Sequence, residues 1–172
     1  MSVKNRLAQG ALILLCSLSF LSGAQAEPPP DTGLKDTEAL RDLKVAKGVF
    51  MLDVKDPGRM AHVLKVIEET QLGIAKQNVK PELIVVLIGP SVAFLTKDRR
   101  GISYLDQRSV TEIQGAIGKL KGMGIRTEAC GVALKGMDVR PDDVIPDVTP
   151  VGNGYISAIG YQAQGYQLVP VY

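Results

Sequence analysis

The sequence feature that most constrains the fold is a continuous apolar run at residues 83–88, Leu-Ile-Val-Val-Leu-Ile. The run is short, rich in β-branched residues and bounded by Pro81 on one side and by Gly89-Pro90 on the other. This pattern is typical of a strand that is buried on both faces, as in a parallel sheet with helices on its two sides. Because parallel strands need crossover connections, the chain around this run must alternate between strands and helices.

The rest of the chain follows this alternation. Further strands are predicted at residues 45–54, 125–129, 148–151 and 166–171. Helices are predicted from Asp56-Pro57 onward, over residues 91–95, around residues 110–120, over one or two turns at 131–137, and at 154–164. This alternation predicts a single α/β domain, with about five strands in a mostly parallel sheet and helices on both faces.

The first 26 residues have the pattern of a secretory signal peptide. Lys4 and Arg6 precede an apolar core at residues 11–21, which is too short to span a membrane. Ala24-Gln25-Ala26 is typical of a cleavage site. We therefore expect cleavage near Ala26, a periplasmic or secreted location, and no stable insertion into a membrane.

The remaining chain is predicted to be one electrically balanced domain. Residues 27–43 are Pro-rich and then charged, which predicts an N-terminal arm, and residues 44–172 hold the domain itself. Without Lys4 and Arg6 of the leader, the 20 basic residues become 18, which balances the 18 acidic residues. A neutral chain with no basic run among aromatic residues is not expected to bind nucleic acid.

The cysteine content limits the chemistry. Without Cys16 of the leader, Cys130 is the only thiol and His62 is the only histidine. The processed chain therefore cannot close an internal disulfide, and it lacks the residues for a metal site built from His and Cys. We expect no metal and no cofactor.

Cys130 stands where the strand predicted at residues 125–129 ends and the helical turns predicted at 131–137 begin. At such a junction a thiol faces unpaired backbone N–H groups and the positive end of a helix dipole, and both favour the reactive thiolate. The opposing interpretation is a small packed side chain, because free cysteine is among the most buried residue types. The sequence leaves both interpretations open.

Several glycine-containing segments are predicted to lie near Cys130. In parallel sheets, ligands bind outside the carboxyl ends of the strands, so the segments that follow the strands, Asp53 included, share one rim. The candidate ligand-binding residues on this rim are Gly89, Pro90, Ser91, Gly131, Gly152, Asn153 and Gly154. The segment Gly152-Asn153-Gly154 fits either a backbone nest for an anion or a plain turn.

Other chemistry-bearing residues are assigned to the surface. His62 lies off the apolar stripe of its helix, which predicts a solvated side chain rather than a catalytic base. Asp142, Asp143 and Asp147 lie around two prolines and predict a solvated loop rather than a hard-metal site. The sequence has no Gly-x-Ser-x-Gly segment, so a hydrolase with a nucleophile elbow is not expected.

Three segments of the sequence resemble the DsrE/DsrF-like family. The first is residues 129–137, Ala-Cys-Gly-Val-Ala-Leu-Lys-Gly-Met, around Cys130. The second is the apolar strand that ends at Gly89-Pro90, with Val-Ala-Phe-Leu at residues 92–95. The third is residues 148–172, in which Gly165-Tyr166 precedes the last predicted strand. Together the resemblance extends over residues 45–172.

The resemblance implies a small α/β fold with a parallel-type sheet, assembled as a homo-oligomer (a trimer or a multiple of it). It also implies the sulfur-relay chemistry of some members, in which the cysteine that matches Cys130 carries a persulfide and exchanges sulfur with a protein donor or acceptor. Two positions depart from the pattern. Many exported relatives have a histidine where Ile88 stands, and many have an asparagine where Val132 stands. Both changes make the rim less polar, which argues against acid–base chemistry there.

Two functional hypotheses follow. In the first, the protein is a periplasmic sulfur carrier or transferase that binds or transfers sulfane sulfur as a persulfide on Cys130. In the second, it is a non-catalytic module for assembly or for binding a small ligand, and Cys130 is merely packed. The exposure and the reactivity of the thiol distinguish the two.

Overall fold

The computed structural model describes residues 33–172, so the predicted signal peptide and the first part of the predicted arm lie outside the described residues. Residues 33–43 form turns without a helix or a strand. The Asp36 backbone N–H donates to Gln77 Oε1 (2.7 Å), and Gln77 Nε2 donates to Asp36 Oδ2 (3.0 Å). These two bonds hold this part of the chain against the end of helix α1 (Pro57–Lys76).

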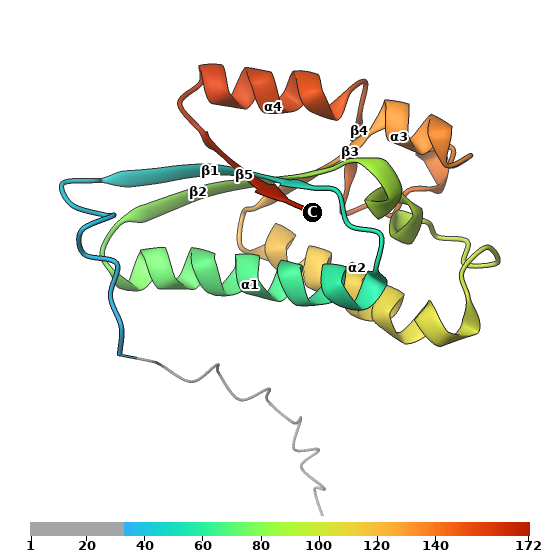
Figure 1. Cartoon of the computed structure of the whole chain (residues 1–172), viewed down its shortest axis with the longest axis horizontal. Helices are drawn as coiled ribbons and strands as arrows, with labels where there is room; N and C mark the ends of the chain where they lie inside the picture. The colour runs from blue at the N-terminus through green and yellow to red at the C-terminus, as the bar shows by residue number, and fades with distance from the viewer. Residues whose placement is uncertain (1–32) are drawn as a thin grey trace, which may run out of the picture. The chain divides into compact units, whose positions relative to one another are not determined.

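Five strands form one sheet: β1 (Val45–Leu52), β2 (Lys80–Leu87), β3 (Arg126–Cys130), β4 (Thr149–Val151) and β5 (Gln167–Val171). Their order is β4-β3-β2-β1-β5, and every neighbouring pair is parallel (Figure 1). The predicted α/β class with a five-stranded parallel sheet is confirmed. The order puts β3 beside β2 and leaves the short strands β4 and β5 at the two edges.

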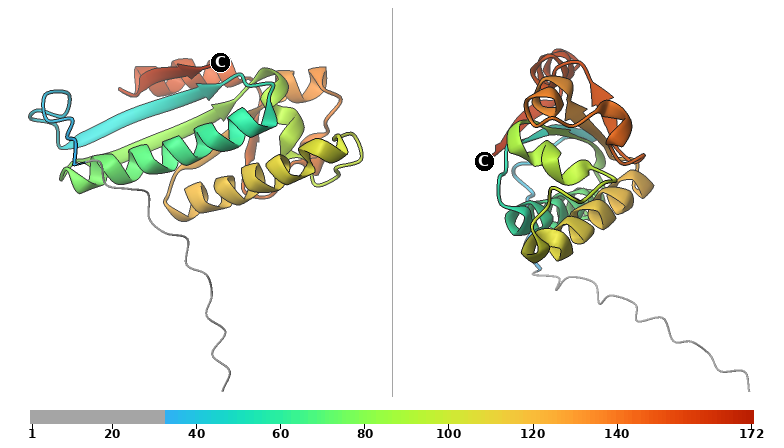
Figure 2. Two further views of the ribbon diagram at one scale, coloured as in Figure 1. Left: turned by 60° about the horizontal axis from the view of Figure 1, so that its bottom comes forward. Right: turned by 90° about the vertical axis from the view of Figure 1, so that its right-hand side faces the viewer.

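Helices cover both faces of the sheet, as the crossover connections between parallel strands require. α1 and α2 (Gln107–Gly122) lie side by side on one face, and α4 (Gly154–Ala163) lies on the other (Figures 1 and 2). α3 (Gly131–Gly136) follows β3 directly at the carboxyl end of the sheet. The described chain also contains three short 3₁₀ helices: η1 (Gly89–Leu95), η2 (Tyr104–Asp106) and η3 (Pro141–Asp143).

Side chains that alternate along the 83–88 run build a core on each face of the sheet. The set that joins the larger core, on the side of α1 and α2, is Leu83, Val85 and Leu87. The set that joins the smaller cluster, on the side of α4, is Ile84, Val86 and Ile88. The burial of both sets confirms that this run forms a strand covered on its two faces.

β2 begins earlier than the apolar run suggested. The sequence places Pro81 at the boundary, whereas the structure places it inside β2, opposite Ala46 of β1. Proline lacks an N–H group and is tolerated in a strand only where no neighbour needs that donor. β3 pairs with β2 only from Ile84 onward, so β2 has a single neighbour at Pro81.

α4 has an apolar outward face. The helix contains no charged residue, and Tyr155, Ile156 and Ile159 have 56%, 68% and 67% of their surfaces exposed. Toward the sheet it presents small residues, of which Gly154 and Ala158 are buried. Neither α4 nor any other helix within residues 33–172 is long and apolar enough to cross a membrane.

Candidate functional site

The carboxyl ends of the strands bring the predicted rim residues together. Gly131 lies against the end of β4, since a Cβ atom on it would lie 2.7 Å from the Val151 carbonyl oxygen and 3.1 Å from that of Gly152. Gly89 lies against Asp53 with a φ angle of +51°, and a Cβ atom there would collide with the Asp53 carboxylate. Glycine at these positions lets the segments that follow the strands pack closely.

Cys130 lies where the sequence predicts, as the last residue of β3 and directly before α3, but its side chain is covered. Only 3% of its surface is exposed, and it belongs to the smaller apolar cluster with Val86 and Ile88. Gly154, the first residue of α4, lies on it: a Cβ atom on Gly154 would be 3.1 Å from the Cys130 Cβ and 2.7 Å from Ile88 Cγ2. The thiol is therefore buried among apolar groups beneath the start of α4.

Two of the predicted ligand-binding side chains have partners inside the fold. Ser91 is fully buried: its Oγ accepts a hydrogen bond from the Val54 backbone N–H (2.7 Å) and lies 3.2 Å from the carbonyl oxygens of Leu52 and Val54. Asn153 caps α4, because its Oδ1 accepts from the Tyr155 backbone N–H (2.9 Å). Ser91 thus ties η1 to the end of β1, and Asn153 fixes the start of α4. Of the other rim residues, Pro90 is half-buried.

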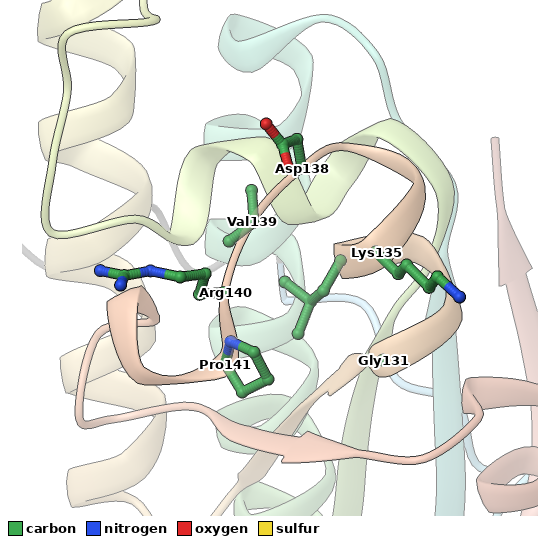
Figure 3. A pocket seen from close by; sticks show the side chains of 7 residues that line it. Gly131, Lys135, Asp138, Val139, Arg140 and Pro141 are labelled. Atoms are coloured by element: carbon green, nitrogen blue, oxygen red, sulfur yellow. The ribbon is translucent and has the colours of Figure 1, made fainter.

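A pocket of about 280 Å³ opens beside the rim (Figure 3). It is lined by Gly131, Leu134, Lys135, Asp138, Val139, Arg140 and Pro141. Figure 3 shows the charged ends of Lys135 and Arg140 directed away from the middle of the pocket, and the Arg140 guanidinium pairs with Asp143 at 2.9 Å. Cys130 is not among the lining residues, so this pocket does not open onto the thiol.

β3 also carries a buried acidic residue that was not predicted from the sequence, Glu128, which is 3% exposed. Its Oε1 accepts a hydrogen bond from the Tyr161 hydroxyl (2.7 Å) and pairs with Arg126 Nε (2.8 Å). Its Oε2 is buried and has no hydrogen-bond partner among the described residues. Because side chains alternate along a strand, Arg126, Glu128 and Cys130 share the face that α4 covers. An acidic residue inside an otherwise buried-type strand was the sequence signal for this group.

Tyr161 joins α4 to this carboxylate. Its ring also makes an edge contact with the ring of Tyr166, with 5.3 Å between the centroids. Lys47 Nζ lies 5.3 Å from the centre of the Tyr166 ring, within range of a cation–π contact. Burial, and then the hydrogen bond to Glu128, raise the pKa of Tyr161 to about 12. The Tyr161 hydroxyl is therefore protonated at neutral pH and donates to Glu128.

The residues assigned to the surface lie away from Cys130. His62 is exposed on α1, which covers the opposite face of the sheet. Asp142 is exposed, whereas Asp143 pairs with Arg140 and Asp147 pairs with Lys121 (2.8 Å). Within residues 33–172, no group of three or more His, Cys, Asp and Glu side chains is arranged to hold a metal ion.

Two solved structures share this fold at low sequence identity. One is a protein of unknown function, MTH1491 from Methanobacterium thermoautotrophicum, with 22% identity and a TM-score of 0.56 over 75% of this chain and 99% of that chain. The other is the ychN protein from E. coli, with 16% identity and a TM-score of 0.54 over 74% of this chain and 99% of that chain. These likenesses establish the fold alone.

The sequence itself carries the family assignment. A comparison with curated proteins finds no significant match. The sequence pattern of the DsrE/DsrF-like family, in contrast, matches residues 56–171, which extend from the start of α1 to the end of β5 and include Cys130. This protein therefore belongs to the DsrE/DsrF-like family.

Proposed function

We propose that this protein is an exported sulfur carrier that binds or transfers sulfane sulfur as a persulfide on Cys130. Membership of the DsrE/DsrF-like family suggests a role of the sulfur-relay type in general. The observation that carries the proposal is the position of Cys130, at the carboxyl end of β3, where parallel sheets present their ligands. Cys130 is also the only cysteine within residues 33–172.

The proposed reaction is an exchange between a persulfide and a thiol. The Cys130 thiolate attacks the outer sulfur of a donor persulfide, so a bond forms between that sulfur and Cys130 Sγ while the sulfur–sulfur bond of the donor breaks. The donor leaves as a thiolate and takes up the proton that Cys130 lost. The same exchange in reverse passes the sulfur to an acceptor thiol. Because the oxidation level of the sulfur is conserved, the exchange needs no added oxidant or reductant.

The surroundings of Cys130 fit storage of sulfur better than rapid acid–base chemistry. Its side-chain neighbours Val86 and Ile88 are apolar, and only 3% of the surface of Cys130 is exposed. An apolar, water-excluded site limits hydrolysis and other side reactions of a bound intermediate. No polar side chain stands at the two positions where many exported relatives have one, so the backbone at the start of α3 is the local support for a thiolate.

The place of action and the assembly state belong to the same proposal. A leader that is cleaved near Ala26 would deliver the domain to the periplasm or outside the cell. Assembly as a homotrimer, or a multiple of it, follows from the family resemblance. The donor and the acceptor of sulfur are then proteins or small thiols of that compartment.

Mass spectrometry of the intact protein tests the proposal. In a Cys16→Ser background, Cys130 is the only cysteine. Incubation with inorganic polysulfide, followed by removal of the reagent, is expected to add the mass of one or more sulfur atoms, and dithiothreitol is expected to remove them. The Cys130→Ser variant is the matched control. A mass increase that persists in the control, or no increase in the parent, rules out a persulfide on Cys130.

The burial of Cys130 favours a second candidate. A thiol with 3% exposure among apolar groups fits a non-catalytic module for ligand binding or assembly, in which cysteine is a packing residue. Reaction with iodoacetamide under native conditions separates the two. A thiol that reacts only when the whole domain unfolds supports the packed interpretation, whereas reaction in the native state supports sulfur handling.

A further inference from the structure

A reactive role for Cys130 requires a movement of the structure. Its side chain is covered by Gly154 of α4, and it is packed in the cluster with Val86 and Ile88. A Cβ atom on Gly154 would already be too close to Ile88 Cγ2, at 2.7 Å, so little free space remains between α4 and the sheet. A partner that delivers sulfur to Cys130, or takes it away, needs access to the thiol that this closed arrangement does not give.

α4 is the element whose displacement would open the site. It begins directly above Cys130, and its buried residues, Gly154 and Ala158, have small side chains or none. α1, in contrast, buries large side chains that include Met60, Leu64 and Ile67. Elements with few buried apolar contacts open locally at a lower free energy than the rest of a domain.

One polar contact compensates for this weak apolar anchoring. The Tyr161 hydroxyl donates to Glu128 Oε1 at 2.7 Å, and among the described residues this is the only side-chain hydrogen bond between α4 and the sheet. Arg126 pairs with the same oxygen and holds the carboxylate in place. Glu128 lies two residues before Cys130, so their Cα atoms are about 6.5 Å apart along the strand.

We propose that Tyr161 and Glu128 form a latch that holds α4 closed over Cys130, and that release of this latch exposes the thiol. Tyr161 and Glu128 are positioning residues in this scheme, because they act on Cys130 through α4. The functional meaning of the latch rests on the proposed function, since only a reactive Cys130 needs controlled access. The closed state shields the thiol or its persulfide, and the open state admits the sulfur donor or acceptor.

The first test compares two tyrosine variants in the Cys16→Ser background. Tyr161→Phe keeps the ring but removes the hydrogen bond to Glu128, so the native-state rate of Cys130 alkylation by iodoacetamide should rise about two- to tenfold, the factor that the loss of one internal hydrogen bond allows. Tyr155→Phe is the matched control, because Tyr155 lies on the same helix with its side chain exposed. Equal alkylation rates in the two variants would overturn the latch.

The second test displaces α4 by its backbone. Gly154→Ala places a Cβ atom against Ile88, Cys130 and Val86, so the start of α4 must shift and alkylation of Cys130 should accelerate. Gly160→Ala adds the same methyl group on the same helix where no atom lies within 4 Å, and its rate should equal that of the parent. No acceleration in a folded Gly154→Ala protein would show that α4 does not control access.

A denaturant series separates local opening from global unfolding. Opening of α4 alone exposes little surface, so the alkylation rate should be insensitive to low concentrations of urea. A rate that rises steeply with urea, in parallel with unfolding of the domain, contradicts the proposal.

Alkylation needs no sulfur donor, so the latch is judged independently of the persulfide. If the variants expose Cys130 to alkylation but the protein never carries sulfur, the latch is supported and the proposed function is refuted. If the protein carries a persulfide but the variants leave the alkylation rate unchanged, the proposed function is supported and the latch is refuted.

Discussion

The pKa of the Tyr161 hydroxyl depends on its burial and on its contact with Glu128. Its pKa is raised to about 12 by burial and by the hydrogen bond to Glu128, whereas a free tyrosine titrates near about 10. A raised pKa in the folded state means that the protonated form contributes stability. That contribution is fully present below about pH 10, and it is lost as the pH rises toward about 12.

We therefore predict a late-titrating tyrosine in the folded protein. The difference between the ultraviolet pH titrations of the parent and Tyr161→Phe should be a single component with a midpoint of about 12. The difference in stability between the two proteins should stay constant up to about pH 10 and shrink above it. If the component that Tyr161→Phe removes has its midpoint at the ordinary value for tyrosine, then the Glu128 contact is absent in solution.

Ser91 illustrates how a residue predicted to bind a ligand can serve the fold. Its hydroxyl is the hydrogen-bond acceptor for the buried Val54 N–H group, so Ser91→Ala should lower the free energy of unfolding by about 1–3 kcal/mol, the cost of an unsatisfied buried donor. Ser109→Ala is the control, since the Ser109 hydroxyl makes no hydrogen bond with the described residues; its effect should stay within about 0.5 kcal/mol. Urea denaturation measures both. If Ser91→Ala is as stable as its control, the Ser91 hydroxyl is not needed for the fold, and the prediction that it binds a ligand stands.

At the scale of the element, the sequence predicted the strands and helices but not the contacts between distant ones. The continuous run at residues 83–88 required a parallel sheet, and the position of Cys130 between a strand and a helix followed from local pattern alone. The cover over Cys130 comes from Gly154, which is 24 residues later, and the partner of Glu128 comes from Tyr161. Such pairings depend on the strand order and on how α4 crosses the sheet, which no local pattern specifies.

The turn from β2 into η1 gives a prediction at this scale. Gly89 has a φ angle of +51°, and an added Cβ atom would meet the Asp53 carboxylate, so Gly89→Ala combines backbone strain with a clash. We expect a loss of more than about 1 kcal/mol in the free energy of unfolding. Gly115→Ala in α2, where no atom lies within 4 Å, should instead stabilise the protein by about 0.5–1 kcal/mol. Gly89→Ala with stability equal to the parent would show that the turn adapts freely.

At the scale of the whole molecule, the outward face of α4 is the best candidate for contact between copies of the chain. Large apolar side chains on a helix are normally buried, yet Ile156 and Ile159 are about two-thirds exposed in the single chain. The edge strand β4, another surface that a neighbouring copy could cover, has only three residues. Assembly on α4 predicts that Ile159→Glu lowers the mass measured by light scattering toward that of the monomer, whereas Val66→Glu, an exposed apolar residue on α1, leaves it unchanged. A parent protein that is already monomeric at micromolar concentration would refute assembly.

The latch and the assembly make one joint prediction, because both act on α4. A neighbouring chain that packed on the outward face of α4 would bind the closed position, and any partner that binds one state stabilises it by mass action. Dilution of the protein should therefore speed the alkylation of Cys130, and higher protein concentration should slow it. Ile159→Glu should remove this dependence on concentration and leave the rate at its dilute value. If light scattering shows dissociation over the same range while the alkylation rate stays constant, then α4 is not both the cover of Cys130 and the contact between chains.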